Sequence, residues 1–543
     1  MSFDAGVTSA AHNQQIWRRR ASRWVWIALI LTGLFVWIAG TDAMPWLRGP
    51  GPFPPEWRWL YAPLGWARTG RNVMHGLLLL AYLGTALLLA LPQPGDGPTT
   101  GRIRRFGQGV ALATLFLLLW QMAQIWLREE SLLDHLIFRT YAPPLNGYFV
   151  APAQVDSIWD TLNNYRAAMP DFFADKAKTH PPGLFIFYAL FNTLFEQLPG
   201  LSGWFAPIAR TWATAGREWP LLMDHLVTSA FVTTLVQITW VSLAPVSLYA
   251  LVRRLDRGNT PGGSETALWA ALLLPLITPL TLLVGQWDPN YLPMAFAAWF
   301  LAVRGQDRLH AGRRDLRVWG DWLGAGLLLS LLTWLSFGNA FIGLLVGLHI
   351  LWREVDNLWA VLGKPIFFVR GSLPTVAGLA TMGTGVVLPW LAAYAAWGMN
   401  FFAMLDYGIS SHFEIVTAHR DYNIWWWMNL VDFTYWLGPG LILLAGVGSV
   451  WLVGNWTRRH TVADRLTCNL AGVALSFWPV LLFLNFSGTT RGEIGRLWIF
   501  LMPYPLLLSL GLLRSPLHRA TLLLITAAVH ITLSYVLTPL LCC

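Results

Sequence analysis

The polar stretch from Leu127 to Gly183 contains the acidic side chains that are best placed to move a proton. Asp156 and Asp160 stand four residues apart, so on a helix they would share one face. A carboxylate within hydrogen-bonding reach of a hydroxyl can act as a general base, and Asp134, earlier in the stretch, is a third candidate. The same pattern is also typical of a solvated amphipathic helix beside a membrane, which needs no catalytic role.

His180 ends this stretch and is followed directly by Pro181, Pro182 and Gly183. Proline suits the first positions of a helix, so the run predicts a sharp start to the apolar segment that follows. His180 would then either cap that helix or hold an anionic group at its positive end. Tyr148, in the same stretch, is a further candidate for contacting a substrate.

A second group of charges, Arg491, Glu493 and Arg496, lies far along the chain in the segment TTRGEIGR. Two arginines that flank a carboxylate beside a bilayer can bind a lipid phosphate through paired hydrogen bonds, with Glu493 fixing one guanidinium. Arginines at the ends of spans also extend to the interface without binding a ligand. The glycines between the charges leave room for a phosphate and favour the first interpretation.

A third polar group consists of His412, His419 and Arg420, and three tryptophans at 425–427 follow it. These side chains are candidates for contacting a substrate, with anchoring at the membrane interface as the alternative. Histidines seven residues apart match no strong metal motif, so no metal ligands are assigned, and a divalent cation is the one cofactor left open. Nucleotide-binding and hydrolase motifs are absent from the sequence.

These groups must be positioned by membrane helices. The 543 residues are 55% hydrophobic and 12% charged, about half the charge of a soluble domain, and apolar runs near 20 residues recur. We therefore expect an all-α polytopic membrane protein. The net charge of +9 comes from short clusters between the runs, as the positive-inside rule requires, so nucleic acid is not an expected partner.

The distribution of basic residues also predicts a topology. Residues 1–23 would form a cytoplasmic tail, and 24–543 one transmembrane domain of about thirteen helices. Extracytoplasmic loops are expected at about 41–72, 127–180, 286–291, 398–436 and 487–496, so all the candidate residues would share one face. Three cysteines, Cys468, Cys542 and Cys543, cannot form a disulfide framework.

Four motifs resemble the GT-C superfamily of membrane glycosyltransferases, and within it the bacterial relatives of the protein mannosyltransferase and aminoarabinose transferase group. They are THPPG at 179–183, DPNY at 288–291, SSHF…HRDYNIWWWMNLVDF at 410–433 and GTTRGEIGRLWIFLMP at 488–503. The resemblance implies transfer of a sugar from a polyprenyl-phosphate donor to a glycan, lipid or protein acceptor at the outer face of a bacterial plasma membrane, generally with inversion. It also implies an acidic base in the large loop and a lipid phosphate held by Arg491 and Arg496.

The sequence departs from this family at one point. The acidic pair expected after an early span is missing, because the first loop has only Asp42 and Glu56, and the expected place in the long loop reads Thr140 to Pro144. A catalytically degenerate relative, or a non-catalytic transporter of lipid or glycan, is therefore the alternative hypothesis. Against transport, the spans contain few charges and no evident repeat.

Overall fold

The computed structural model describes the chain except for 1–3, 53–55, 66–68, 92–99, 130, 257–264, 363–372, 458–464 and 539–543. It is 82% helical and has no strands among the described residues, where extended backbone pairs only in an isolated bridge between Tyr61 and Leu537. The predicted all-α polytopic class is confirmed. The predicted tail is continuous with the first helix, and Cys542 and Cys543 lie outside the described residues.

Nine helices in the described part of the chain are long and apolar enough to cross a membrane. They are Ala21–Thr41 of α1 (Asp4–Thr41), α2 (Thr69–Ala90), Ile103–Arg128 of α3 (Thr100–Arg128), Asp224–Leu255 formed by α12 (Asp224–Ser242) and α13 (Ala244–Leu255), α17 (Leu316–Leu335), α19 (Leu373–Trp397), α22 (Pro439–Thr457), α23 (Arg465–Ser487) and α26 (Pro516–Val536). A tenth span is possible if α10 (Gly183–Glu196) and α11 (Pro199–Arg210), bent by 100°, are counted as one.

This count is below the predicted thirteen because several apolar runs form short or charged helices. The run after Glu265 is divided by Pro275 and Pro279 into α14 (Glu265–Leu273) and α15 (Thr278–Leu282), and α25 (Pro503–Leu512) has ten residues. Proline removes a helical hydrogen bond and so ends or bends a helix. Two further helices, α16 (Tyr291–His310) and α18 (Ala340–Leu362), contain several charged residues.

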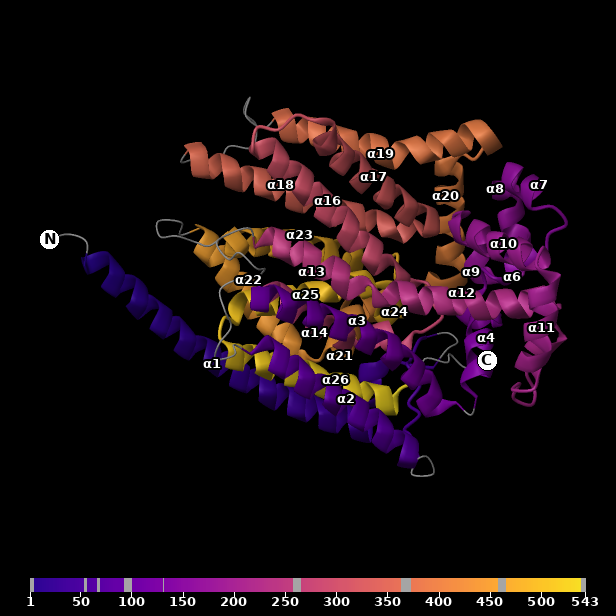
Figure 1. Ribbon diagram of the computed structural model, residues 1–543, viewed down its shortest axis with the longest axis horizontal. Helices are drawn as coiled ribbons and strands as arrows, with labels where there is room; N and C mark the ends of the chain where they lie inside the picture. The colour runs from indigo at the N-terminus through magenta and orange to yellow at the C-terminus, as the bar shows by residue number, and fades with distance from the viewer. Residues whose placement is uncertain are drawn as a thin grey trace.

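The predicted long loop is a set of short helices packed on the end of the bundle. They are α4 (Leu132–Tyr141), α5 (Pro143–Asn146), α6 (Val150–Ala153), α7 (Ile158–Asn163), α8 (Tyr165–Ala168) and α9 (Asp175–Lys178). Most of them lie, with α11, at the end of the molecule opposite the N-terminus (Figure 1). The later polar region also is helical, as α20 (Phe401–His412) and α21 (Tyr422–Leu437).

Gly183 brings α10, and with it the end of the long loop, directly against α17. A Cβ atom on Gly183 would lie 2.3 Å from the carbonyl oxygen of Trp334, which is backbone and cannot move aside. Only glycine permits this approach, a use of small residues that is common between membrane helices.

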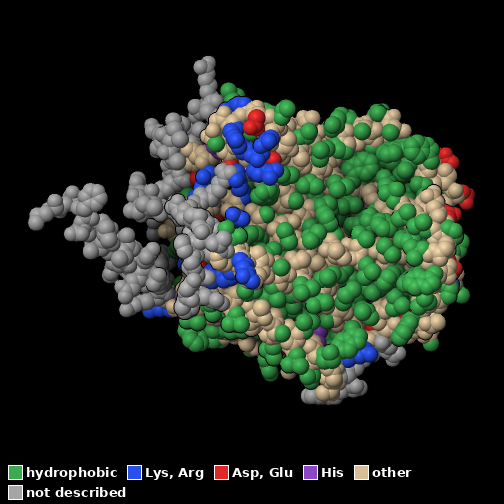
Figure 2. All heavy atoms as spheres, in the orientation of Figure 1, with side chains coloured by type: hydrophobic (Ala, Val, Ile, Leu, Met, Phe, Trp, Pro, Cys, Tyr) green, Lys and Arg blue, Asp and Glu red, His purple; other side chains and the backbone are tan. Residues whose placement is uncertain are grey.

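Side chains are sorted by type along the bundle. Hydrophobic side chains cover the middle of the visible face, Lys and Arg gather toward the end that carries the N-terminus, and Asp and Glu lie along the far rim and, in smaller number, among the basic side chains (Figure 2). Large apolar side chains of the spans, such as Ile30, Leu80 and Val450, are more than 60% exposed. A soluble protein would cover such a surface, and a bilayer does so here.

Candidate functional site

The segment that contains Glu493 forms a strained turn. Gly492 has φ +85° and Glu493 has φ +58°, a left-handed conformation that costs a non-glycine residue free energy. Two residues of α21 hold the turn in place: Asn429 accepts the Gly492 N–H at 3.0 Å and Asp432 accepts the Ile494 N–H at 2.9 Å. The turn then enters α24 (Ile494–Leu497).

Glu493 lies between two guanidinium groups. Its carboxylate is 2.7 Å from Arg496 Nη2 and 3.1 Å from Arg420 Nη2, and all three side chains are largely buried. Burial alone would raise the pKa of Glu493, but the charges of Arg496, Arg420 and Lys176 outweigh it and lower the pKa to about 2. Glu493 is therefore ionised near neutral pH, where it anchors two arginines.

Arg491 has a different role from the one its position in the sequence predicts. Its Nη1 donates to the carbonyl oxygens of Thr417 at 3.2 Å and Arg420 at 2.5 Å, while Arg420 Nη1 donates to the carbonyl of Arg491. The two backbone segments are thus joined by reciprocal arginine contacts. The arginines that flank Glu493 are Arg420 and Arg496, rather than Arg491 and Arg496.

Asp288 joins this group from the opposite side. It lies in the single-turn helix η6 (Asp288–Asn290), and its Oδ2 is 3.8 Å from Arg496 Nε. Burial raises the pKa of Asp288, although the charges of Arg496 and Lys176 oppose that effect. Arg496 Nε has no hydrogen-bond partner, so one donor of this guanidinium stays available.

Lys176, from α9, is the third cation of the group. Its Nζ donates to the carbonyl of Leu145 at 3.1 Å. Burial and the charge of Arg496 lower the pKa of Lys176 to about 7, against the raising effects of Glu493 and Asp288. We call Lys176, Asp288, Arg420, Glu493 and Arg496 the Arg496 cluster.

His180 supports this cluster as a neutral side chain. Its Nδ1 is 2.9 Å from the carbonyl of Lys176, which only accepts, so Nδ1 carries the proton and Nε2 accepts from Tyr148 Oη at 2.9 Å. Burial, with the positive charge of His412 next, lowers the pKa of His180 to about 3. The N-cap of α10 is Pro182, so His180 does not cap that helix. It instead positions Lys176 and Tyr148.

The two later histidines are separated. His412 ends α20 beside the cluster: burial lowers its pKa, and the charges of Arg496 and Arg420 add to this while Glu493 opposes it. His419 is exposed. Among the described residues, no three His, Cys, Asp or Glu side chains come together as a metal site would require.

None of the three predicted catalytic aspartates contacts a residue of the cluster in the described part of the chain. Asp156 precedes the N-cap Ser157 and Asp160 lies in the first turn of α7, so they do not share one helix face, and both are exposed. Asp134 is fully buried and accepts hydrogen bonds from Trp219 Nε1 at 2.6 Å and Thr214 Oγ1 at 2.8 Å. These bonds fasten the segment after α11 to α4, which is a structural role.

Two members of the cluster, Asp288 and Lys176, are not among the site residues predicted from the sequence, although Asp288 lies in the DPNY motif. Asp288 stands before Pro289 and reads as a turn residue, which it also is, since it begins η6. Lys176 carries one available signal: the chain has three lysines among 37 basic residues, and two of them, Lys176 and Lys178, stand together ahead of His180.

Comparison with protein-family models, with curated proteins and with solved structures gives no match for this chain.

Proposed function

We propose that the protein is a membrane glycosyltransferase of GT-C type, which moves a sugar from a polyprenyl-phosphate donor to an acceptor at the extracytoplasmic face. The observation that carries the proposal is Arg496, a largely buried guanidinium with a donor unused, set between the carboxylates of Asp288 and Glu493. Three cations from separate segments meet there, as binding of a phosphodiester in a low-dielectric site requires. The sequence motifs HPPG, DPNY and RGEIGR all lie in or beside this cluster.

Four residues of the cluster have distinct parts in the proposed reaction. Arg496 and Lys176 hold the phosphate of the donor, and Glu493 fixes the guanidinium of Arg496. Asp288 is the general base, because its pKa is raised and its contact with Arg496 is the looser one. Glu493 is unsuited to that task, since a carboxylate with a pKa of about 2 is a poor proton acceptor.

In the proposed step an acceptor hydroxyl loses its proton to Asp288 while its oxygen bonds to the anomeric carbon. The bond from that carbon to the phosphate oxygen breaks, and its electron pair leaves with the polyprenyl phosphate. Arg496 and Lys176 stabilise the charge that develops on the leaving phosphate. One displacement of this kind inverts the anomeric configuration.

The proposal includes the orientation of the chain in the membrane and its number of spans. The basic end of the bundle would face the cytoplasm of a bacterium, so the N-terminus is cytoplasmic and the Arg496 cluster lies at the outer face of the plasma membrane. Counting the charged helices α16 and α18 and the shorter apolar helices brings the spans to about thirteen.

A turnover assay tests the proposal. The protein in nanodiscs is incubated with a panel of synthetic polyprenyl-phosphate sugars, and released polyprenyl phosphate is measured. Asp288→Asn is expected to lower kcat roughly 100-fold or more with little change in KM. Arg496→Gln is expected both to lower kcat and to raise KM. Asp171→Asn, an exposed aspartate of the same loop, is the matched control and keeps full turnover.

The alternative of transport gives a different result in the same preparation. A transporter reconstituted in vesicles would move the lipid-linked sugar between leaflets without releasing polyprenyl phosphate. That outcome, or full turnover by Asp288→Asn, would overturn the proposed enzymatic role.

A further inference from the structure

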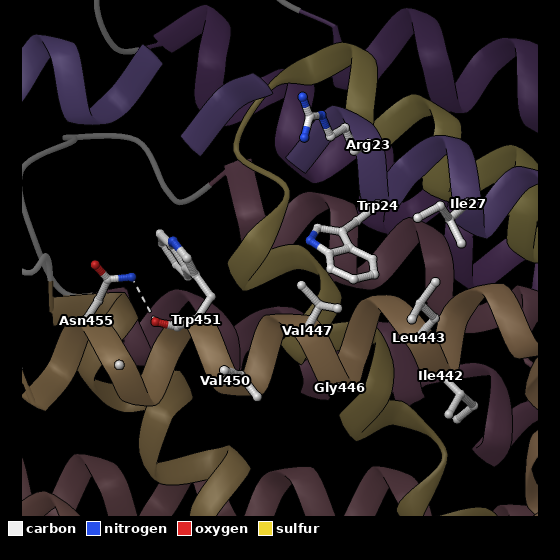
Figure 3. Close-up of a pocket in the computed structure, with 11 residues that line it drawn as sticks. Arg23, Trp24, Ile27, Ile442, Leu443, Gly446, Val447, Val450, Trp451 and Asn455 are labelled. Carbon is white, nitrogen blue, oxygen red and sulfur yellow. Dashed lines mark hydrogen bonds between the residues drawn. The ribbon is translucent and has the colours of Figure 1, made fainter. Parts of the chain in front are cut away.

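An apolar groove runs between α1 and α22, remote in the sequence from every residue of the Arg496 cluster. It has a volume of about 860 Å³ and is lined by eleven residues of these two helices, among them Ile27, Leu443 and Val447. Figure 3 shows side chains of both helices facing each other across it. The volume falls in the range of about 300–1,000 Å³ that is typical of sites for small molecules.

The polar residues of the lining occupy one half of the groove. Figure 3 shows Arg23 and Trp24 of α1 beside the middle of the lining on α22, with Trp451 and Asn455 continuing it toward the end of α22. Arg23 is exposed and has no carboxylate partner in the described part of the chain, and the groove lining contains no Asp or Glu. Tryptophan and arginine at the end of an apolar span mark the level of lipid headgroups.

The length and form of the groove match one lipid leaflet. On α22 the lining extends from Ile442 to Asn455, about 20 Å of helix, whereas the hydrocarbon of one leaflet is about 15 Å deep. Gly446 and Gly454 leave open space, because a Cβ on either would meet no atom within 4 Å. A flexible acyl chain can therefore lie along the seam while a headgroup stays beside Arg23.

We propose that this groove binds an anionic phospholipid, whose phosphate contacts Arg23 and whose acyl chain lies between α1 and α22. The unpaired positive charge selects an anionic headgroup, and the apolar lining below it takes the chain. The site lies at the basic end of the bundle, where the chain begins, so it is separate from the proposed donor site. It goes beyond the proposed glycosyl transfer and does not depend on it.

Native mass spectrometry of the detergent-purified protein tests this site. Phosphatidylglycerol and phosphatidylcholine with identical acyl chains are titrated in parallel, and phosphatidylglycerol is expected to bind more tightly. One arginine at a lipid surface is worth roughly five-fold in binding, so Arg23→Gln should weaken phosphatidylglycerol by that factor and phosphatidylcholine less, because the choline cation offsets the charge of its phosphate. Arg313→Gln, another exposed arginine at a helix end, is the matched control and should change neither.

A second pair of variants tests the apolar part. Gly446→Leu fills the groove and should weaken both lipids, whereas Gly383→Leu, at an equally open glycine of α19, should weaken neither. Equal affinity of the wild type and Arg23→Gln for phosphatidylglycerol would overturn the proposal. So would a dimer, seen by light scattering, that Gly446→Leu dissociates, because a second copy would then occupy the groove. Gel filtration shows whether Gly446→Leu folds. If it does not fold, the difference in phosphatidylglycerol affinity between the wild type and Arg23→Gln tests the proposal.

Discussion

Burial and pairing separate the two carboxylates of the Arg496 cluster. Glu493 contacts two guanidinium groups at 2.7 and 3.1 Å, while Asp288 has one at 3.8 Å. Charges that are this close lower a pKa far more than a longer contact does, and burial raises the pKa of the less well-paired group. Two acidic residues beside one arginine thus have pKa values shifted in opposite directions, and the raised pKa of Asp288 suits the proton acceptor proposed above.

Lys176 should make donor binding depend on pH. Its pKa of about 7 means that the ammonium loses its proton as pH rises through neutrality, so the affinity for an anionic donor should fall between about pH 6 and pH 8.5. Loss of one charged hydrogen bond corresponds to a fall of roughly ten-fold or more. The measurement is the Kd for a polyprenyl-phosphate hexose, since this phosphodiester keeps its charge across the range.

The matched variants isolate the lysine from other titrating groups. Lys176→Arg should bind the donor independently of pH, because a guanidinium stays protonated throughout. Lys176→Met should bind weakly, with no pH dependence. A slope that persists in Lys176→Arg would assign the titration to another group and remove Lys176 from the donor site.

Residue types in the sequence indicate where charge is concentrated, but not which charges pair. Asp134 and Arg491 are residue types that could take part in chemistry, but both are engaged in structural hydrogen bonds. Asp134 accepts from an indole and a hydroxyl, and Arg491 donates to two backbone carbonyls. Their partners are some 70 to 85 residues away along the chain. Spacing arguments cannot reach that far. His180, Arg420, Glu493 and Arg496 could be nominated from sequence, and the DPNY motif contains Asp288, but Lys176 and the contact of Asp288 with Arg496 required the fold.

At the scale of the elements, three short helices bring the cluster together. The segments α9, η6 and α24 each have only three or four residues, and each takes its place from the longer helices around it. α21 holds the turn at Glu493 through two hydrogen bonds. α10, the next helix after α9, packs against α17 at Gly183. The geometry of the cluster therefore depends on helix contacts made outside it.

Gly183→Ala tests the contact between α10 and α17. The new Cβ would meet the Trp334 carbonyl at 2.3 Å, so the helices must separate, at a cost of about 1–3 kcal/mol. We expect a lower apparent melting temperature in detergent. Gly203→Ala is the control, because that glycine of α11 has open space around it and alanine favours a helix. An unchanged melting temperature for Gly183→Ala would show that this approach is not tight.

At the scale of the whole molecule, composition predicts the fold class correctly but does not predict the number of membrane spans. Halved charge and recurrent apolar runs predict membrane helices because backbone polar groups in lipid must pair within each segment. Hydropathy does not predict breaks such as those at Pro275 and Pro279, where one apolar run becomes two short buried helices. Such helices are buried by neighbouring helices, and sequence reveals apolarity without revealing what covers it.

The proposed orientation gives a labelling pattern for the intact molecule. With Cys468, Cys542 and Cys543 changed to serine, Asp160→Cys and Arg313→Cys each add one thiol at an exposed position. Asp160 lies with the short helices at one end of the bundle, and Arg313 follows α16 among the basic residues. Since basic loops are retained in the cytoplasm, a membrane-impermeant maleimide should label Asp160→Cys in intact cells and Arg313→Cys only after permeabilisation. The reverse pattern would place the Arg496 cluster in the cytoplasm and exclude transfer at the outer face.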